Sequence, residues 1–313
     1  MKIVSCFSDV KELEPLARAG ADEFYTAARE LPAFHSGEMP LSRLPGAIKL
    51  AHSLGKKISV AVNAVLARAT ARQLAAIEKS VRRLDDAGAD SFIFASPYLL
   101  RMFSAPGRRL RARLHLSSVQ PVFNSFAAAF FARFGVSRVI LPSQLPPSEA
   151  GPLLSFCREK GIETEIFDYR FFGCAYVNGR CQLHEPGHYT ARGKSGRASM
   201  CRLPAGGGLV RPAGLDVPGR AGELPSVLAR LERRLASGDL PGVSDSAAFF
   251  DFFSAGVDYL KYGTRRDPSA VKTAKVRAMR AMTALAEKLS AGGRADARKR
   301  FVAEMSGWTG GGL

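Results

Sequence analysis

Three cysteines lie in one irregular stretch of the chain, and they are the residues most suited to chemistry. Cys174 is followed by Cys181 after six residues and by Cys201 after nineteen more. Thiolate is the ligand that iron–sulfur clusters require, and it also binds zinc. The spacing therefore predicts a site for an iron–sulfur cluster or a zinc ion.

A site with four thiolates needs one more ligand, and the other two cysteines are the first candidates. Cys6 ends the first predicted strand, where α/β folds build their sites, so we favour it. Cys157 lies within a predicted helix, where a free cysteine commonly packs as a small hydrophobe. His184 or His188 could instead complete a zinc site of three cysteines and one histidine, and the third alternative is that no fourth cysteine exists.

Polar side chains at predicted strand ends are the candidates for catalysis. Glu165 stands beside the cysteine-containing stretch, where it could bind a substrate proton or hydroxyl group. Asn63, Ser117 and Lys261 also fall at or near strand ends, which face the active side of a barrel. We select Glu165, Asn63 and Lys261 as catalytic candidates. The alternatives are an exposed strand carboxylate for Glu165 and hydrogen-bonded rim residues for the others.

Short apolar stretches alternate with longer amphipathic ones along most of the chain. The predicted strands are 2–7, 20–25, 57–63, 91–94, 113–117, 138–141, 162–167 and 256–261. The predicted helices begin near 8–9 and then cover 42–54, 70–87, 123–134, 149–160, 223–236, 246–255 and 269–289. Glycine follows several of these helices, as expected of left-handed C-caps. This rhythm predicts an α/β fold of the (β/α)₈ TIM-barrel type.

One domain of residues 1–290 accounts for this pattern, with the cysteine-containing loop inserted at about 169–221. A loop this long inside a compact domain is usually functional or disordered, and its cysteines favour a function. Residues 291–313 are expected to form a basic tail that ends in glycines.

Composition limits the remaining choices. The chain has 45 Lys and Arg against 28 Asp and Glu, a net charge of +17, so RNA is a conceivable partner. The charge is spread along the chain, which also fits a simple solvated surface. No apolar stretch is long enough for a signal peptide or a membrane span, so we expect a cytoplasmic protein with reduced thiols.

Several motifs, in order over roughly residues 1–285, resemble those of the U32 "peptidase/collagenase-like" family. The family's Glu-Val-Phe strand, its Cys-x-x-Tyr-x-Gly-x-Cys motif and a later Cys-Arg are similar to residues at 165–167, 174–181 and 201–202. Other blocks that resemble the family lie at 20–25, 62–63, 116–124, 135–141 and 256–265. The resemblance implies a (β/α) barrel that binds a [4Fe–4S] cluster through four cysteines.

The chain departs from the family pattern at three places. Gln144 replaces the carboxylate of a Ser-Arg-Glu-Leu motif, and an amide cannot act as a base. One cysteine of a paired Cys-x-x-x-Cys-Arg is absent, its place being near Arg197. The β-rich extension of longer RNA-modifying members is also missing. The length is similar to the short branch, whose paired members support oxygen-independent ring hydroxylation in ubiquinone biosynthesis.

These features lead to three hypotheses of different classes. The resemblance implies an iron–sulfur protein that assists oxygen-independent hydroxylation of a small aromatic quinone precursor or a nucleobase, and a second U32-type protein as partner. A peptidase is the second hypothesis, although the chain has no His-Glu-x-x-His or Gly-x-Ser-x-Gly motif. The third is a scaffold or binding barrel that has lost its cluster.

Overall fold

The computed structural model describes residues 1–33, 39–64, 66, 69–168, 246–263, 265, 267–292 and 296–306. The predicted helix 223–236 and the insertion expected at 169–221 lie outside these ranges, as do the terminal glycines.

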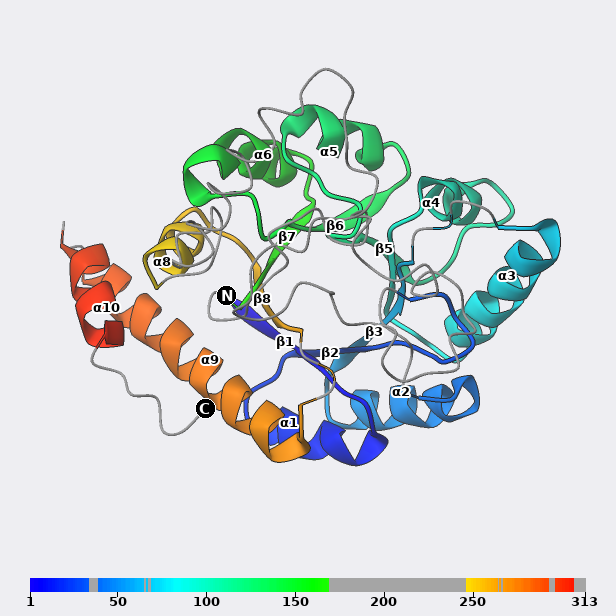
Figure 1. Cartoon of the computed structure of the whole chain (residues 1–313), viewed down its shortest axis with the longest axis horizontal. Helices are drawn as coiled ribbons and strands as arrows, with labels where there is room; N and C mark the ends of the chain where they lie inside the picture. The colour runs from blue at the N-terminus through cyan, green and yellow to red at the C-terminus, as the bar shows by residue number, and fades with distance from the viewer. Residues whose placement is uncertain are drawn as a thin grey trace, which may run out of the picture.

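Within these ranges, eight parallel strands close into one barrel in which each strand pairs with the next and β8 pairs with β1. The predicted TIM-type barrel is thereby confirmed. Figure 1 shows the strands at the centre and the helices around them. The strands are β1 (Lys2–Cys6), β2 (Glu23–Thr26), β3 (Lys57–Val62), β4 (Ser91–Phe94), β5 (Arg113–Leu116), β6 (Val136–Ile140), β7 (Glu163–Phe167) and β8 (Tyr259–Tyr262).

The helices follow the strands in the order expected of this fold. They are α1 (Leu13–Arg18), α2 (Leu44–Ser53), α3 (Ala71–Asp86), α4 (Pro97–Ser104), α5 (Ser125–Ala132), α6 (Pro147–Glu159), α8 (Ser246–Ser254), α9 (Ser269–Ala291) and α10 (Ala297–Ser306), with short 3₁₀ turns η1 (Val10–Glu12) and η2 (Leu41–Arg43). The sequence predicted no helix between β4 and β5, where α4 lies. Its two turns are too short for a clear helical period, but Pro97 at the first position pre-organises the first turn.

Local capping explains where several helices begin and end. The Thr70 side chain accepts from the Gln73 backbone amide while Gln73 reaches back to Thr70, which is a capping box at the start of α3. Asn124 caps α5 in the same way by accepting from the amide of Ala127. Gly88, just beyond α3, has a φ of +92°, a conformation that favours glycine.

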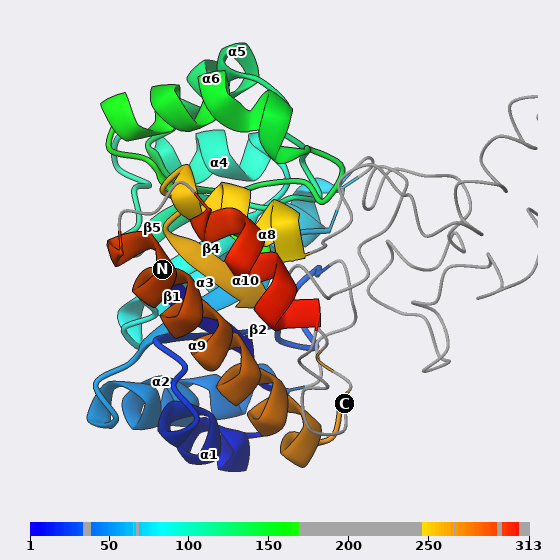
Figure 2. The same ribbon diagram turned by 90° about the vertical axis from the view of Figure 1, so that its left-hand side faces the viewer.

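The segment expected to be a tail begins with a helix. Helix α10 packs against α8 and α9 (Figure 2). Phe301 on α10 is buried, with ring centroids 5.6 Å from Phe249 and 5.1 Å from Phe250. The burial of Phe301 stabilises the packing of α10 against α8. The basic residues around Phe301 gave no sign of this contact in the sequence.

The outward strand positions build the apolar layer between barrel and helices. Phe24, Phe92, Leu116, Val139 and Leu260 are among its buried members. Lys272 of α9 is also buried. Its ammonium group donates to Glu12 at 2.8 Å, so a buried ion pair joins α9 to η1.

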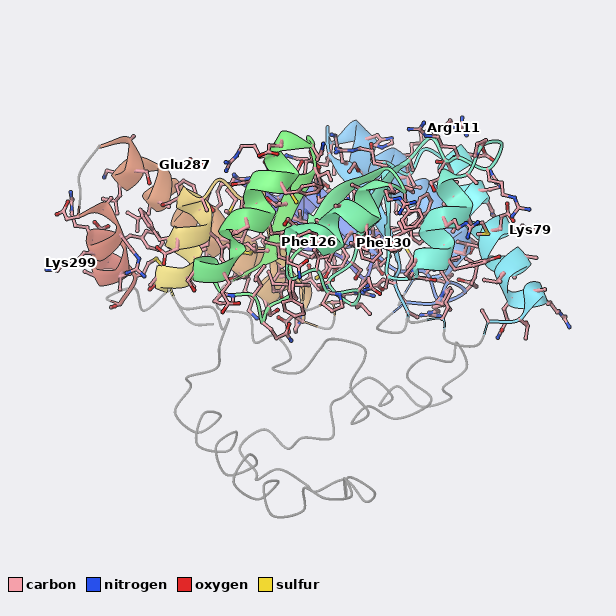
Figure 3. All side chains as sticks on the ribbon, turned by 90° about the horizontal axis from the view of Figure 1, so that it is seen from above. Lys79, Arg111, Phe126, Phe130, Glu287 and Lys299 are labelled. Atoms are coloured by element: carbon pink, nitrogen blue, oxygen red, sulfur yellow. The ribbon has the colours of Figure 1, made fainter. Side chains whose placement is uncertain are left out.

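Some aromatic residues remain outside this core. Among the described residues, the exposed large hydrophobics are Tyr98, Phe123, Phe126 and Phe130. Phe126 and Phe130 lie on the same side of the molecule (Figure 3). No helix in the described ranges is both long and apolar enough to span a membrane.

Candidate active site

The lumen of the barrel is lined by charged and polar side chains. Glu23, His115, Arg138, Glu165 and Lys261 lie on different strands and are all buried. Arg138 and Lys261 make ion pairs across or between strands, and His115 shares their side of the sheet because it pairs in register with Arg138. Branched apolar side chains usually fill such barrels. A charged lumen is therefore the feature that calls for a functional account.

Arg138 is the centre of this network. Its guanidinium group donates to Glu23 at 2.7 and 3.0 Å, to Glu165 at 3.0 Å and to Glu163 at 3.0 Å. Its central carbon also lies 3.4 Å from the centroid of the Tyr259 ring. Burial alone would lower the pKa of Arg138, but Glu165 and Glu23 outweigh burial and raise it. Arg138 therefore stays charged and fixes three carboxylates in place.

Lys261 and Glu165, two of the catalytic candidates, are brought together in the lumen. The Lys261 ammonium group donates to Glu165 at 2.7 Å and lies 4.0 Å from the centroid of the Tyr25 ring. Burial lowers the pKa of Lys261, although Glu165 opposes that change. Glu165 is not an exposed strand carboxylate: it is buried and shared between Lys261 and Arg138. This pairing holds the ammonium group at a fixed place below the barrel mouth.

Asn63 and Ser117 form a second polar pair, above the ends of β3 and β5. The Asn63 amide donates to the Ser117 hydroxyl at 3.0 Å, and that hydroxyl also accepts from the Val119 amide at 3.3 Å. Both side chains are buried. They are hydrogen-bonded rim residues whose donors and acceptors stand at the carboxyl end of the barrel, where this fold places its reactions.

His115 was missed by the sequence analysis. Both of its ring nitrogens are buried and have no hydrogen-bond partner in the described chain. Burial lowers the pKa of His115 well below its ordinary value, and the nearby Arg138 lowers it further, so the ring is neutral. The signal was present in the alternation Arg113-Leu-His115-Leu-Ser117, in which every second residue of the strand is polar.

Cys6 ends β1 and pairs in register with Tyr25, so the two side chains share the lumen side of the sheet. Burial raises the pKa of the Cys6 thiol to about 12, although Lys272, Arg265 and Lys261 act in the opposite direction. A bound metal lowers the pKa of its thiol ligand, and nearby cations favour the thiolate. In the absence of a metal, burial outweighs these cations and the Cys6 thiol is protonated, so it is the position of Cys6 at the end of β1 that fits a cluster ligand.

Most of the other predicted ligands lie outside the described residues. Cys174, Cys181 and Cys201 lie outside the described residues, as do His184 and His188. Within the described ranges, no group of three or more His, Cys, Asp or Glu side chains is arranged to hold a metal ion. The buried Cys157 packs within α6, as expected of a small hydrophobe. Gln144, where the sequence analysis noted a lost carboxylate, follows β6 and is partly exposed.

Comparisons with known proteins agree with the motif blocks. The model of peptidase family U32 matches residues 8–290. The chain is 25% identical over 207 residues to "tRNA hydroxylation protein P" of Helicobacter pylori, covering 65% of this chain and 47% of that protein. It is 28% identical over 136 residues to "tRNA hydroxylation protein P2" of Bacillus subtilis, covering 43% of this chain and 42% of that protein. The chain thus spans less than half the length of either curated relative.

Solved structures align at lower sequence identity. A U32 peptidase aligns with 54% of this chain and 68% of its own, at 14% identity and a TM-score of 0.45. A dihydrodipicolinate synthase from Acinetobacter baumannii aligns with 54% of this chain and 64% of its own, at 13% identity and a TM-score of 0.37.

Proposed function

Because the chain belongs to peptidase family U32, we propose that it is an iron–sulfur protein that assists the oxygen-independent hydroxylation of a base in tRNA. Two curated relatives are named as tRNA hydroxylation proteins, which supports a nucleobase over a quinone precursor as substrate. The net charge of +17 suits a polyanionic partner. The observation that supports the proposal is that Cys6 and the Asn63–Ser117 pair stand at the carboxyl ends of β1, β3 and β5, in a barrel whose lumen holds the Lys261–Glu165 ion pair.

The proposed cluster ligands are Cys174, Cys181, Cys201 and Cys6. A bound [4Fe–4S] cluster would exchange electrons during transfer of oxygen from a donor other than dioxygen. Lys261, Arg265 and Lys272 oppose the burial that keeps the Cys6 thiol protonated, and these cations would lie near the negative charge of a bound cluster.

The other residues of the lumen bind and orient the substrate in this proposal. A base taken out of its stack is recognised by hydrogen bonds to its polar edge. Asn63 and Ser117 supply an amide and a hydroxyl group of the kind that binds such an edge. Lys261 supplies an ammonium group that Glu165 and the Tyr25 ring hold in position.

Peptidase activity has weaker support in the described residues. A cysteine nucleophile acts as a thiolate beside a base, usually histidine. Cys6 is buried, with a pKa raised to about 12 by that burial. His115, the histidine in the lumen, makes no hydrogen bond within the described chain. Neither group is set up for nucleophilic attack.

The test is a nucleoside analysis of tRNA from anaerobically grown cells that lack the gene. We expect one nucleoside to lose a hydroxyl oxygen, as seen by mass spectrometry. The wild-type chain and a Cys157→Ser control should restore that oxygen, whereas a Cys174→Ser, Cys181→Ser, Cys201→Ser variant should not. If the cells that lack the gene have unchanged tRNA but a quinone without one of its hydroxyl groups, the substrate is the aromatic quinone precursor. If neither the tRNA nor the quinone changes, the proposal is rejected.

A further inference from the structure

Arg265 follows β8 at the carboxyl end of the barrel, and its surroundings are unusual for an arginine. Its side chain is only 8% exposed. Within the part of the chain that the structure describes, its Nε and Nη1 atoms have no hydrogen-bond partner. A buried guanidinium group that lacks acceptors has lost its hydration without compensation, which is costly. Some other group is expected to supply the missing acceptors.

The charges around Arg265 do not neutralise it. Lys272 is paired with Glu12 at 2.8 Å, and Lys261 is paired with Glu165 at 2.7 Å. Arg265 has no carboxylate at ion-pair distance among the described residues. Its guanidinium group hydrogen-bonds the Tyr25 phenol, and it lies close enough to Cys6 to oppose the rise in the pKa of that thiol. The mouth of the barrel therefore carries one buried positive charge that the described side chains leave unbalanced.

Arg265 is nevertheless held firmly in place. Its backbone carbonyl accepts from the Ser8 hydroxyl at 2.6 Å, and that hydroxyl accepts from the Lys272 ammonium group at 2.7 Å. Its guanidinium carbon lies 5.5 Å from the centroid of the Tyr25 ring, which Lys261 approaches to 4.0 Å. Two cations thus share one aromatic ring at the mouth. A donor fixed in this way binds without a large ordering cost.

We propose that Arg265 anchors an oxyanion-binding site, specific for a phosphate or carboxylate group, at the carboxyl end of β8. The fork of a guanidinium group matches two oxygens of either anion. Barrels of this type frequently bind phosphate beside the loops that follow the seventh and eighth strands. The inference rests on the proposed function only in treating this mouth as the substrate end.

Two sources could supply the oxyanion. A backbone phosphate of RNA would reach the site together with the base that enters the mouth. An acidic group on a small co-substrate would reach it directly. Both sources place two oxygens against Arg265, so binding of simple probes identifies the site, and larger probes identify the source.

The experiment uses the full chain, purified anaerobically, as wild type, Arg265→Gln and Arg265→Lys, with Arg133→Gln on the exposed end of α5 as a matched control. Calorimetry measures binding of inorganic phosphate and of succinate at constant ionic strength, and then of a short single-stranded RNA. We expect Arg265→Gln to bind at least tenfold more weakly than wild type and the control, and Arg265→Lys to fall between them. Loss of RNA binding alone would identify backbone phosphate, and loss of succinate binding alone a small acid.

Stability without ligand separates a binding role from a structural one. Because Nε and Nη1 of Arg265 have no acceptor among the described residues, Arg265→Gln should unfold at the same or a higher temperature than wild type in anion-free buffer, whereas a structural arginine would lower that temperature. Equal anion binding in wild type and Arg265→Gln would overturn the proposal. The proposal would also be overturned if Arg265→Gln changed only the absorption spectrum or the reduction potential of the cluster, because Arg265 would then act on the cluster and not on an anion. No turnover is measured, so a failure to hydroxylate tRNA leaves this result standing.

Discussion

Replacing Arg138 by methionine would remove the cation that three lumen carboxylates share. Glu23 and Glu165 are both buried and hydrogen-bonded to Arg138, and Glu163 is partly buried beside it. Methionine is of similar length, so the change mainly deletes charge and donors. Lys261 and Arg113 remain paired with Glu165 and Glu163. The variant would therefore leave Glu23 as a buried carboxylate whose cation has been removed.

The expected loss of unfolding free energy follows from the burial of Arg138 and its carboxylate partners. Breaking a buried ion pair by removing one partner costs about 3–5 kcal/mol of unfolding free energy. For a chain of this size each kcal/mol moves Tm by roughly 2–4 °C, so Tm should fall by about 6–20 °C.

Urea and thermal unfolding of Arg138→Met, beside the exposed control Arg133→Met, measure this effect. The control should stay within about 0.5 kcal/mol of wild type. A loss below about 1 kcal/mol in Arg138→Met would refute the view that the lumen is a tightly coupled ion network.

Three further changes test other parts of the structure. Below about pH 6.5, the unfolding free energy of wild type should fall by up to about 1.4 kcal/mol per pH unit, because His115 takes up a proton more readily in the unfolded chain than in the folded one. Urea titrations of His115→Phe should lack that dependence on pH. Phe131→Ala should cost about 3–5 kcal/mol in denaturant unfolding, whereas Phe126→Ala, at 85% exposure, should be nearly neutral, and equal losses would contradict the burial. Lys272→Met leaves Glu12 without its partner and should destabilise by about 3–5 kcal/mol, and a neutral result would show that the pair contributes little.

The sequence predicted the barrel because its strands and helices alternate with clear turn signals. It also placed Asn63, Ser117, Glu165 and Lys261 near strand ends. The predicted barrel implied that β7 and β8 are neighbours, as they are. The pairing of Lys261 with Glu165 could not be predicted, since it also depends on the register of the two strands and on which side of each strand faces the lumen.

Other features were missed because charged strand residues are normally read as exposed. Glu23, Arg138 and Glu163 each lie next to an apolar residue on one side and a polar residue on the other, which also suits a half-exposed strand. Only closure of the barrel turns that polar face inward. Arg265 was seen as part of a motif block, but its missing hydrogen-bond partners appear only once the fold surrounds it. Helix α10 was missed because its basic residues suggested a tail.

Iron and sulfide analysis of anaerobically purified protein tests the central proposal most directly. The wild-type chain should carry about four irons and four sulfides per polypeptide, as expected of one [4Fe–4S] cluster. Cys6→Ala and the variant lacking Cys174, Cys181 and Cys201 should lose most of that iron, whereas Cys157→Ser should keep it. Wild-type protein that remains free of iron and sulfide after anaerobic purification and reconstitution would contradict the account.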